Sequence, residues 1–319
     1  MIFNKIKFNY NIKVLDGLFL DKKYQDIWSL LNGQKGNPYF INLLFYAIEK
    51  FLSKPENSQF YQRKFIWVSS FDSTDTDYIG EFLNFYLQKS SGYSLTSKRY
   101  PSLLEENLKK MHVDLVPKNI NFDLLVNNSN LYQHVILAME NKEIVISRTS
   151  GAFFEAPKNK YFIYPSSTLC SFHILKNPYH LYSRYRLQNY THQECLNLIS
   201  GQDEKVDLSP NTNPYVLENR QSWSVNTKSW TDENVQNTYR GKIIKHEEML
   251  NSPNDVLISV VYHLKQAGLN TDVDFDLIDK FVENNKLNEN LNFELSNQEA
   301  KQITNSLQKE ILIDHNYQL

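Results

Sequence analysis

The sequence predicts an α/β protein, a three-layer sandwich in which helices cover both faces of a mostly parallel sheet, with a helical addition at the N-terminus. Compact β-branched and aromatic segments alternate with helical patterns, as a parallel sheet requires. In addition, residues 64–70, K-F-I-W-V-S-S, lead through a polar turn at 72–77 into a helical pattern at 78–87. Strand, polar loop and helix in this order are typical of a phosphate-binding α/β unit.

The chain is expected to divide into a helical N-terminal extension, residues 1–60, and an α/β domain, residues 61–319. Within the extension, residues 21–31 and 39–52 carry apolar residues at helical spacing. The further expected strands cover residues 143–147, 171–175 and 240–245. The further expected helices cover residues 179–190, 253–268, 274–284 and 297–309; Ser252-Pro253 and a capping box at Ser296 begin two of them.

Composition excludes several classes of protein. The chain has 319 residues, 41% of them hydrophobic and 22% charged, which are ordinary values for a globular protein. Its 34 basic and 36 acidic residues nearly balance, so no nucleic-acid partner is expected. Cys170 and Cys195 form neither a disulfide framework nor a C-x-x-C pair, which favours a cytoplasmic setting. We expect neither a signal peptide nor a membrane span, since apolar stretches long enough for either are lacking.

Five short segments occur in an order and at a spacing that point to one known family. The first joins residues 65–71, F-I-W-V-S-S-F, through residues 72–78 to I-G-E-F-L-N-F-Y-L. It corresponds without a gap to I-W-L-A-S-Y, P-K-S-G-N-T-W and L-R-A-F-L-A-N-Y of bacterial PAPS-dependent sulfotransferases. The other segments are I-S-R-T-S-G-A at 146–152, similar to V-K-T-H-x-A; I-L-K-N-P-Y-H at 174–180, similar to I-V-R-N-P-x-D; S-W-S at 222–224 with S-W at 229–230, similar to S-W-S-x-H-V-x-S-W; and K-H-E-E-M at 245–249, similar to R-Y-E-D-M.

The resemblance implies a P-loop-like fold and the transfer of a sulfuryl group from PAPS to a hydroxyl or amine. It leaves open whether the acceptor is a small molecule, a glycan or a protein, and leaves the oligomeric state open too. The residues that it assigns to the cofactor are Ser73, Thr74, Asp75 and Thr76 in the loop, and Lys176 and Arg184 near the 3′-phosphate. The residues at the family's catalytic segment are Arg148 and Ser150.

Three of these positions depart from the family's chemistry. Ser73 stands where the family has the loop lysine, Asp75 where it has a glycine, and Ser150 where it has the catalytic histidine. A carboxylate about 5 Å from a phosphate charge costs roughly 3 kcal/mol at an effective dielectric constant of about 20. Losing the lysine contact removes a further ~1.5–3 kcal/mol. The alternative to a transferase is therefore a non-catalytic descendant that kept the fold as a binding or interaction protein.

The aspartates of the loop allow two interpretations. Asp72, Asp75 and Asp77 offer the oxygen ligands that Mg²⁺ or Ca²⁺ prefers. The simpler interpretation, which we favour, is that they cap the helix that follows, and no residue is assigned as a metal ligand. Arg184, together with Arg186, is either a phosphate contact or a solvated helix residue.

The remaining aromatic and sulfur positions are interpreted as structural. Trp223 and Trp230 are expected to pack in the core rather than to stack on a substrate, and Cys170 to be a buried strand residue.

Overall fold

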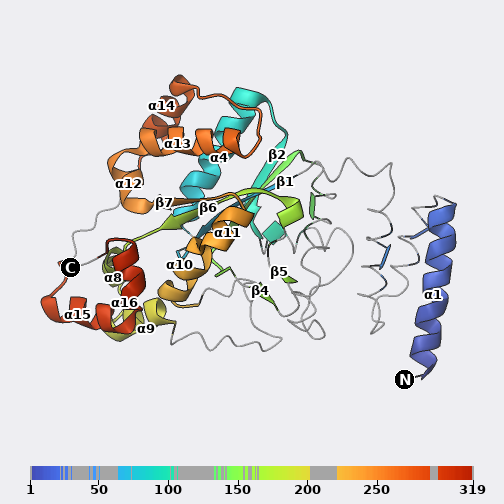
Figure 1. Cartoon of the computed structure of the whole chain (residues 1–319), viewed down its shortest axis with the longest axis horizontal. Helices are drawn as coiled ribbons and strands as arrows, with labels where there is room; N and C mark the ends of the chain where they lie inside the picture. Colours follow the sequence, from blue (N-terminus) through green and yellow to red (C-terminus); the bar gives the residue numbers. More distant parts are fainter. Residues whose placement is uncertain are drawn as a thin grey trace.

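The protein is represented by a computed structural model. It describes residues 2–21, 64–72, 74–100, 142–153, 165–201, 221–287 and 294–317, together with scattered residues between these ranges. One parallel sheet forms its centre, with helices on both faces, which confirms the predicted three-layer α/β architecture (Figure 1). Among the described residues, no helix has the length and apolar character needed to cross a membrane.

The sheet has five strands in the order β2-β3-β1-β6-β7, and every neighbouring pair is parallel. The strands are β1 (Lys64–Ser70), β2 (Leu95–Arg99), β3 (Ile144–Thr149), β6 (Thr168–Leu175) and β7 (Gly241–Lys245). Because β1 lies between β3 and β6, the loop that leaves β1 emerges between the carboxyl ends of these two neighbours. A separate antiparallel pair consists of β4 (Glu155–Ala156) and β5 (Lys160–Tyr161).

One face of the sheet is covered by α4 (Asp75–Ser91), α13 (Pro253–Gln266) and α14 (Phe275–Asn284) (Figure 1). Apolar side chains of β1 and β3 pack there against these helices; members of this cluster include Ile66, Val68, Ile146, Phe82, Leu257 and Phe281. Burial of so many aliphatic and aromatic side chains, at about 25 cal/mol per Å² of apolar surface, holds the sheet and helices together.

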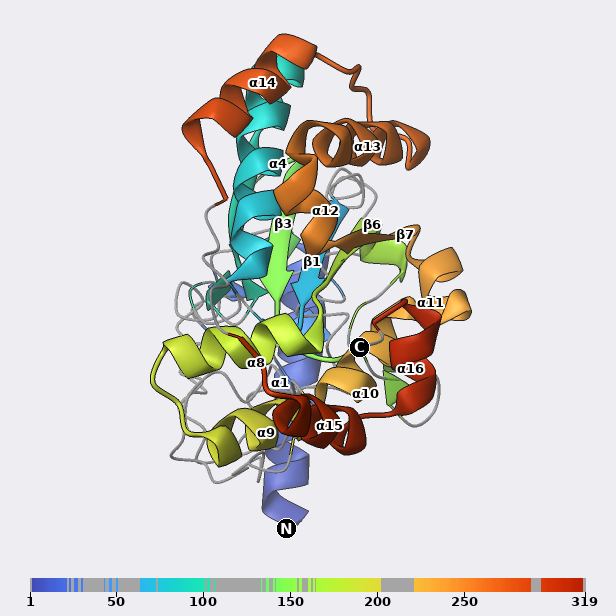
Figure 2. The same cartoon turned by 90° about the vertical axis from the view of Figure 1, so that its left-hand side faces the viewer.

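Other helices lie on the opposite face and beyond the carboxyl ends of the strands. The helix α10 (Trp223–Thr231) packs on β6, where the indole of Trp230 stacks on the His173 ring at a centroid distance of 5.9 Å. It is followed by α11 (Glu233–Thr238). Beyond the carboxyl ends lie α8 (Pro178–Leu187), α9 (His192–Ser200), α15 (Asn297–Ser306) and α16 (Lys309–Asp314), and β1 and β3 run side by side toward α8 (Figure 2).

The start and stop residues from which the sequence predicted these helices occupy the expected positions in the structure. Ser296 caps α15 in a capping box with Glu299, and Pro253 occupies the first turn of α13. Gly268, two residues after α13, has a φ of +99°, a backbone conformation that favours glycine. The expected strands and helices of the α/β domain agree with the observed ones within a few residues at each end.

Some elements were not predicted. The strand β2, L-T-S-K-R, was missed because its polar residues hide the alternation expected of a strand, and the short α12 (His246–Asn251) was missed as well. In the N-terminal extension, α1 (Ile2–Leu20) is helical, whereas the helices expected at 21–31 and 39–52 fall largely outside the described residues. The division of the chain after residue 60 stays a prediction.

Candidate functional site

The candidate site begins in the turn between β1 and α4. The helix starts at Asp75, three residues before the helical pattern that the sequence places at 78–87. Thr74 is the N-cap residue but makes no side-chain capping bond; its amide and its hydroxyl both donate to Asp72 Oδ1, at 3.1 and 3.0 Å. The expected capping of α4 by aspartate side chains is therefore wrong, although Asp75 and Asp77 do lie in the first turn, where the helix dipole favours carboxylates. Ser73 lies outside the described residues.

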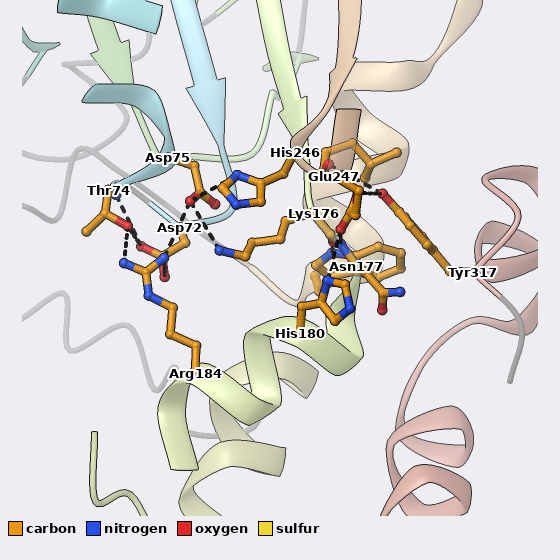
Figure 3. A network of polar contacts seen from close by, with 12 residues as sticks. Asp72, Thr74, Asp75, Lys176, Asn177, His180, Arg184, His246, Glu247 and Tyr317 are labelled. Atoms are coloured by element: carbon orange, nitrogen blue, oxygen red, sulfur yellow. Dashed lines mark hydrogen bonds and ion pairs between the residues drawn. The ribbon is translucent and has the colours of Figure 1, made fainter. Parts of the chain in front are cut away.

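Asp75 is the centre of a buried ionic cluster (Figure 3). Its side chain is 3% exposed, and Oδ1 lies 3.4 Å from Lys176 Nζ, 3.4 Å from Arg184 Nη1 and 3.5 Å from His246 Nδ1. Burial raises the pKa of the Asp75 carboxyl, and the cations of Lys176 and Arg184 partly oppose this shift. Oδ2 is also buried and accepts no hydrogen bond from the part of the chain that the structure describes.

Lys176 reaches this cluster because β6 neighbours β1 in the sheet. It is the first residue after β6, so its side chain leaves the sheet at the same edge as the β1–α4 turn, as predicted. The side chain is 1% exposed, and its backbone carbonyl accepts a hydrogen bond of 3.0 Å from Trp223 Nε1. Lys176 is thus a buried cation that faces a carboxylate, where the family resemblance implies that it faces a phosphate.

Arg184 comes from α8, which Asn177 caps by accepting a hydrogen bond from the Tyr179 amide. Its guanidinium lies 3.4 Å from both Asp72 Oδ2 and Asp75 Oδ1, and Nη2 donates to Thr74 Oγ1 at 2.6 Å. The alternative of a solvated helix residue is therefore wrong for Arg184. Arg186 behaves differently, because it donates to the Tyr190 carbonyl near the end of its own helix.

A second carboxylate fixes α8 to the end of β7. Glu247 accepts hydrogen bonds from the Asn177 amide at 2.9 Å and from the Tyr317 hydroxyl at 3.0 Å, and it lies 3.3 Å from His180 Nδ1 (Figure 3). Burial opposes ionisation of Glu247, but the close approach of His180 and the hydrogen bonds from Asn177 and Tyr317 outweigh it and hold the pKa below its ordinary value. Glu247 therefore positions the start of α8, and through it Arg184.

On the other side of β1, Arg148 occupies the carboxyl end of β3. It forms an ion pair with Asp77, the third aspartate of the turn. Its side chain lies against α4 at Gly80, where a Cβ atom would come within 2.7 Å of Arg148 Cδ. Arg148 Nε is buried and has no hydrogen-bond partner among the described residues.

The remaining predicted positions are buried. Ser150 is buried, and its carbonyl accepts a hydrogen bond of 2.9 Å from Asn226 Nδ2 of α10. Thr76 is buried in the first turn of α4. Trp223 and Trp230 are 0% and 1% exposed, which confirms their core packing, and Cys170 is fully buried as expected. In the described ranges, no group of three or more histidine, cysteine or acidic residues could hold a metal ion.

A cavity of about 870 Å³ lies at the opposite, amino end of the strands. Its walls include Glu143 and the segment from Asn270 to Asp276. Ligands of open α/β sheets bind beyond the carboxyl ends of the strands, where the ionic clusters lie. We therefore assign the site to the carboxyl edge.

Three residues of the site were missed from the sequence. His246 and Glu247 belong to the segment K-H-E-E-M, whose place directly after a strand was a usable signal. Tyr317 carried no signal, because its contact with Glu247 spans 70 residues. No protein-family model matches the chain, and no curated protein matches it in sequence. The resemblance to sulfotransferases therefore rests on the landmarks of the sequence.

Proposed function

We propose that this chain is a sulfotransferase-like protein that no longer uses PAPS, and that it acts as a binding or interaction protein. The observation that carries the proposal is the position of Asp75. Its carboxylate lies within 3.5 Å of three side chains, Lys176, Arg184 and His246, that face the turn in which a PAPS-dependent relative would hold a phosphate.

The charges of this edge support the proposal. The resemblance offers three cations to the donor nucleotide and the transferred group, namely Lys176, Arg184 and Arg148. The turn and the start of α4 supply three carboxylates, and each cation lies within ion-pair distance of at least one of them. A dianionic phosphate that approached these cations would enter next to Asp75 and Asp72.

The size of the electrostatic repulsion favours exclusion of a phosphate from this edge of the sheet. A phosphate charge about 5 Å from one carboxylate is repelled by roughly 3 kcal/mol at an effective dielectric constant of ~20. Each 1.4 kcal/mol changes a dissociation constant about tenfold, so one carboxylate weakens binding by about two orders of magnitude. Moving Asp75 away from its cations to admit a phosphate does not lower the total cost, because a buried charge that loses its partner costs about 3–5 kcal/mol.

A transferase remains the second candidate, and one observation favours it. Arg184 and Lys176 come from separate elements yet both reach the β1–α4 turn, as residues that bind a nucleotide phosphate must do. A divalent cation that bridged the aspartates to a phosphate would remove the repulsion. This candidate predicts that Mg²⁺ is needed for nucleotide binding.

Calorimetric titration with 3′,5′-ADP, the product of PAPS, tests the proposal. The unmodified chain is expected to show no binding tighter than about millimolar, either with or without Mg²⁺. Micromolar binding without metal would contradict the proposal, and binding that appears with Mg²⁺ and disappears with a chelator would support the transferase instead.

A further inference from the structure

We propose that a second site, at the carboxyl ends of β2 and β3, binds a small hydrophilic molecule that carries one acidic group. The site is a surface cavity of about 340 Å³ lined by Asp77, Lys98, Arg99, Ser102, Glu106 and Arg148. It goes beyond the proposed loss of PAPS binding and does not depend on it, since it lies on the far side of β1 from Lys176 and Arg184.

The register of the sheet brings two arginines together. Arg99 of β2 pairs with Arg148 of β3, so the two residues lie side by side on neighbouring parallel strands. In-register neighbours project from the same face of a sheet, and like charges in such a pair repel each other. The face is the one that carries α4, because Arg148 lies against Gly80 and Ser97 Oγ donates to the Gly80 carbonyl.

The carboxylates that line the cavity do not balance the positive charges of the two arginines. Asp77 is paired with Arg148, and Glu106 is paired with Lys98 through a short contact that raises the pKa of the lysine. Within the described residues, the half-buried Arg99 side chain has neither a hydrogen bond nor an ion pair. Among the residues that line the cavity, three cations therefore face two carboxylates. Glu140, outside this lining, also acts on Lys98, and Arg99 is the cation that no described carboxylate pairs.

The residues that line the cavity indicate the chemical class of its ligand. All six lining residues are polar or charged, and the volume lies at the lower end of the range of small-molecule sites. A single cation that is unpaired among the described residues, Arg99, suits one carboxylate or sulfate ester better than a phosphate dianion. Planar guanidinium groups bind such oxyanions in a bidentate manner, and the half-buried Arg99 is the guanidinium of the wall that no described carboxylate pairs. The carboxylates and Ser102 can accept hydrogen bonds from hydroxyl groups on the body of the ligand.

Titration with D-glucuronate, D-glucose and methyl sulfate tests this site by calorimetry. D-Glucuronate is expected to bind at least tenfold more tightly than D-glucose, which has nearly the same shape but no charge. Methyl sulfate, a sulfate ester with a single negative charge, is expected to compete with D-glucuronate, and raised ionic strength is expected to weaken the binding of both. If D-glucuronate binds no better than D-glucose, or if methyl sulfate does not compete, the proposal is overturned.

Two variants locate the binding. Arg99→Gln removes the excess cation without leaving a carboxylate unpaired, and is expected to weaken D-glucuronate binding at least tenfold. Lys89→Gln, which removes an exposed lysine from the last turn of α4, is the matched control and is expected to leave binding unchanged. Equal affinity of Arg99→Gln and the unmodified chain would overturn the proposal, as would an equal loss in both variants. Binding of 3′,5′-ADP is a separate measurement, so failure of one proposal is distinguishable from failure of the other.

Discussion

The two sides of β1 give cations at the same edge of the sheet two different environments. On the β6 side, Lys176 is buried and Arg184 is mostly buried, and both face Asp75. On the β3 side, Arg148 is paired but Arg99, one strand farther out, has no partner among the described residues. The carboxylates of the β1–α4 turn lie within ion-pair distance of Arg148 of β3, Lys176 at the end of β6 and Arg184 of α8, but not of Arg99 of β2. Cations within their reach have become part of the structure, whereas Arg99 remains available to a ligand.

The largest change in the free energy of unfolding is expected on the β6 side of β1. Lys176→Met keeps most of the apolar volume of the side chain but removes the ammonium group from Asp75. A buried carboxylate that loses a partner destabilises the folded state, so the free energy of unfolding is expected to fall by about 3 kcal/mol at pH 7. Urea denaturation measures this, with the exposed Lys89→Met variant as control. A loss below about 1 kcal/mol would mean that Asp75 does not depend on Lys176.

The same variant should respond to pH in a defined direction. Burial already raises the pKa of Asp75 in the folded chain, and removing Lys176 raises it further. Because the folded pKa lies above the unfolded value of about 3.9, protonation of Asp75 stabilises the folded state. The stability deficit of Lys176→Met relative to the unmodified chain is therefore expected to shrink as the pH falls from 7 toward 4. A deficit that stays constant or grows would assign the loss to packing instead.

An intermediate effect is expected where α4 meets Arg148. An alanine in the interior of a helix normally stabilises it by about 1 kcal/mol relative to glycine. At Gly80, the new methyl group would lie 2.7 Å from Arg148 Cδ and would displace the side chain from Asp77, so Gly80→Ala is expected to bring no gain or a loss. Gly17→Ala in α1 is the control and is expected to stabilise its helix, because among the described residues no atom beyond its chain neighbours and the adjacent helix backbone lies within 4 Å of the new methyl group. Thermal unfolding followed by circular dichroism compares the two.

The smallest change in the free energy of unfolding is expected at Arg99 of β2. Arg99→Gln removes a charge that has no partner among the described residues and that repels its in-register neighbour Arg148. Its free energy of unfolding is therefore expected to stay within about 0.5 kcal/mol of that of the unmodified chain, or to rise. A loss of more than about 1 kcal/mol in urea denaturation would show that Arg99 has a structural role like that of Lys176.

The sequence predicted the fold better than it predicted the site. Continuous apolar segments such as Lys64–Ser70, and local capping signals such as Ser296, depend on neighbours in the chain, so they could be interpreted without the structure. The placement of Lys176 beside the turn followed from the parallel sheet. The strand β2 could not be predicted, because L-T-S-K-R is stabilised by pairing with β3 and not by its own apolar pattern.

The main difference between sequence and structure lies in the role of the aspartates in the β1–α4 turn. The sequence favours Asp75, like the other two aspartates of the turn, as a capping residue, because an aspartate at a helix N-terminus is stabilised by the helix dipole. Its true partners, Lys176 and His246, are 101 and 171 positions away and are brought close only by the order of the strands. Whether the resemblance to sulfotransferases extends to function stays a prediction, as do the roles inferred from it for Arg148 and Ser150.

The central claim is that Asp75 excludes a nucleotide phosphate from this edge, and a gain of binding tests it most directly. Ser73→Lys combined with Asp75→Gly introduces the ammonium group and the backbone approach that the resemblance associates with phosphate binding. Calorimetry with 3′,5′-ADP is expected to show binding at least tenfold tighter than that of the unmodified chain, whereas Ser73→Lys alone, which keeps the carboxylate, is expected to show little gain. Micromolar binding by the unmodified chain, or a folded double variant that binds no better, would contradict the claim.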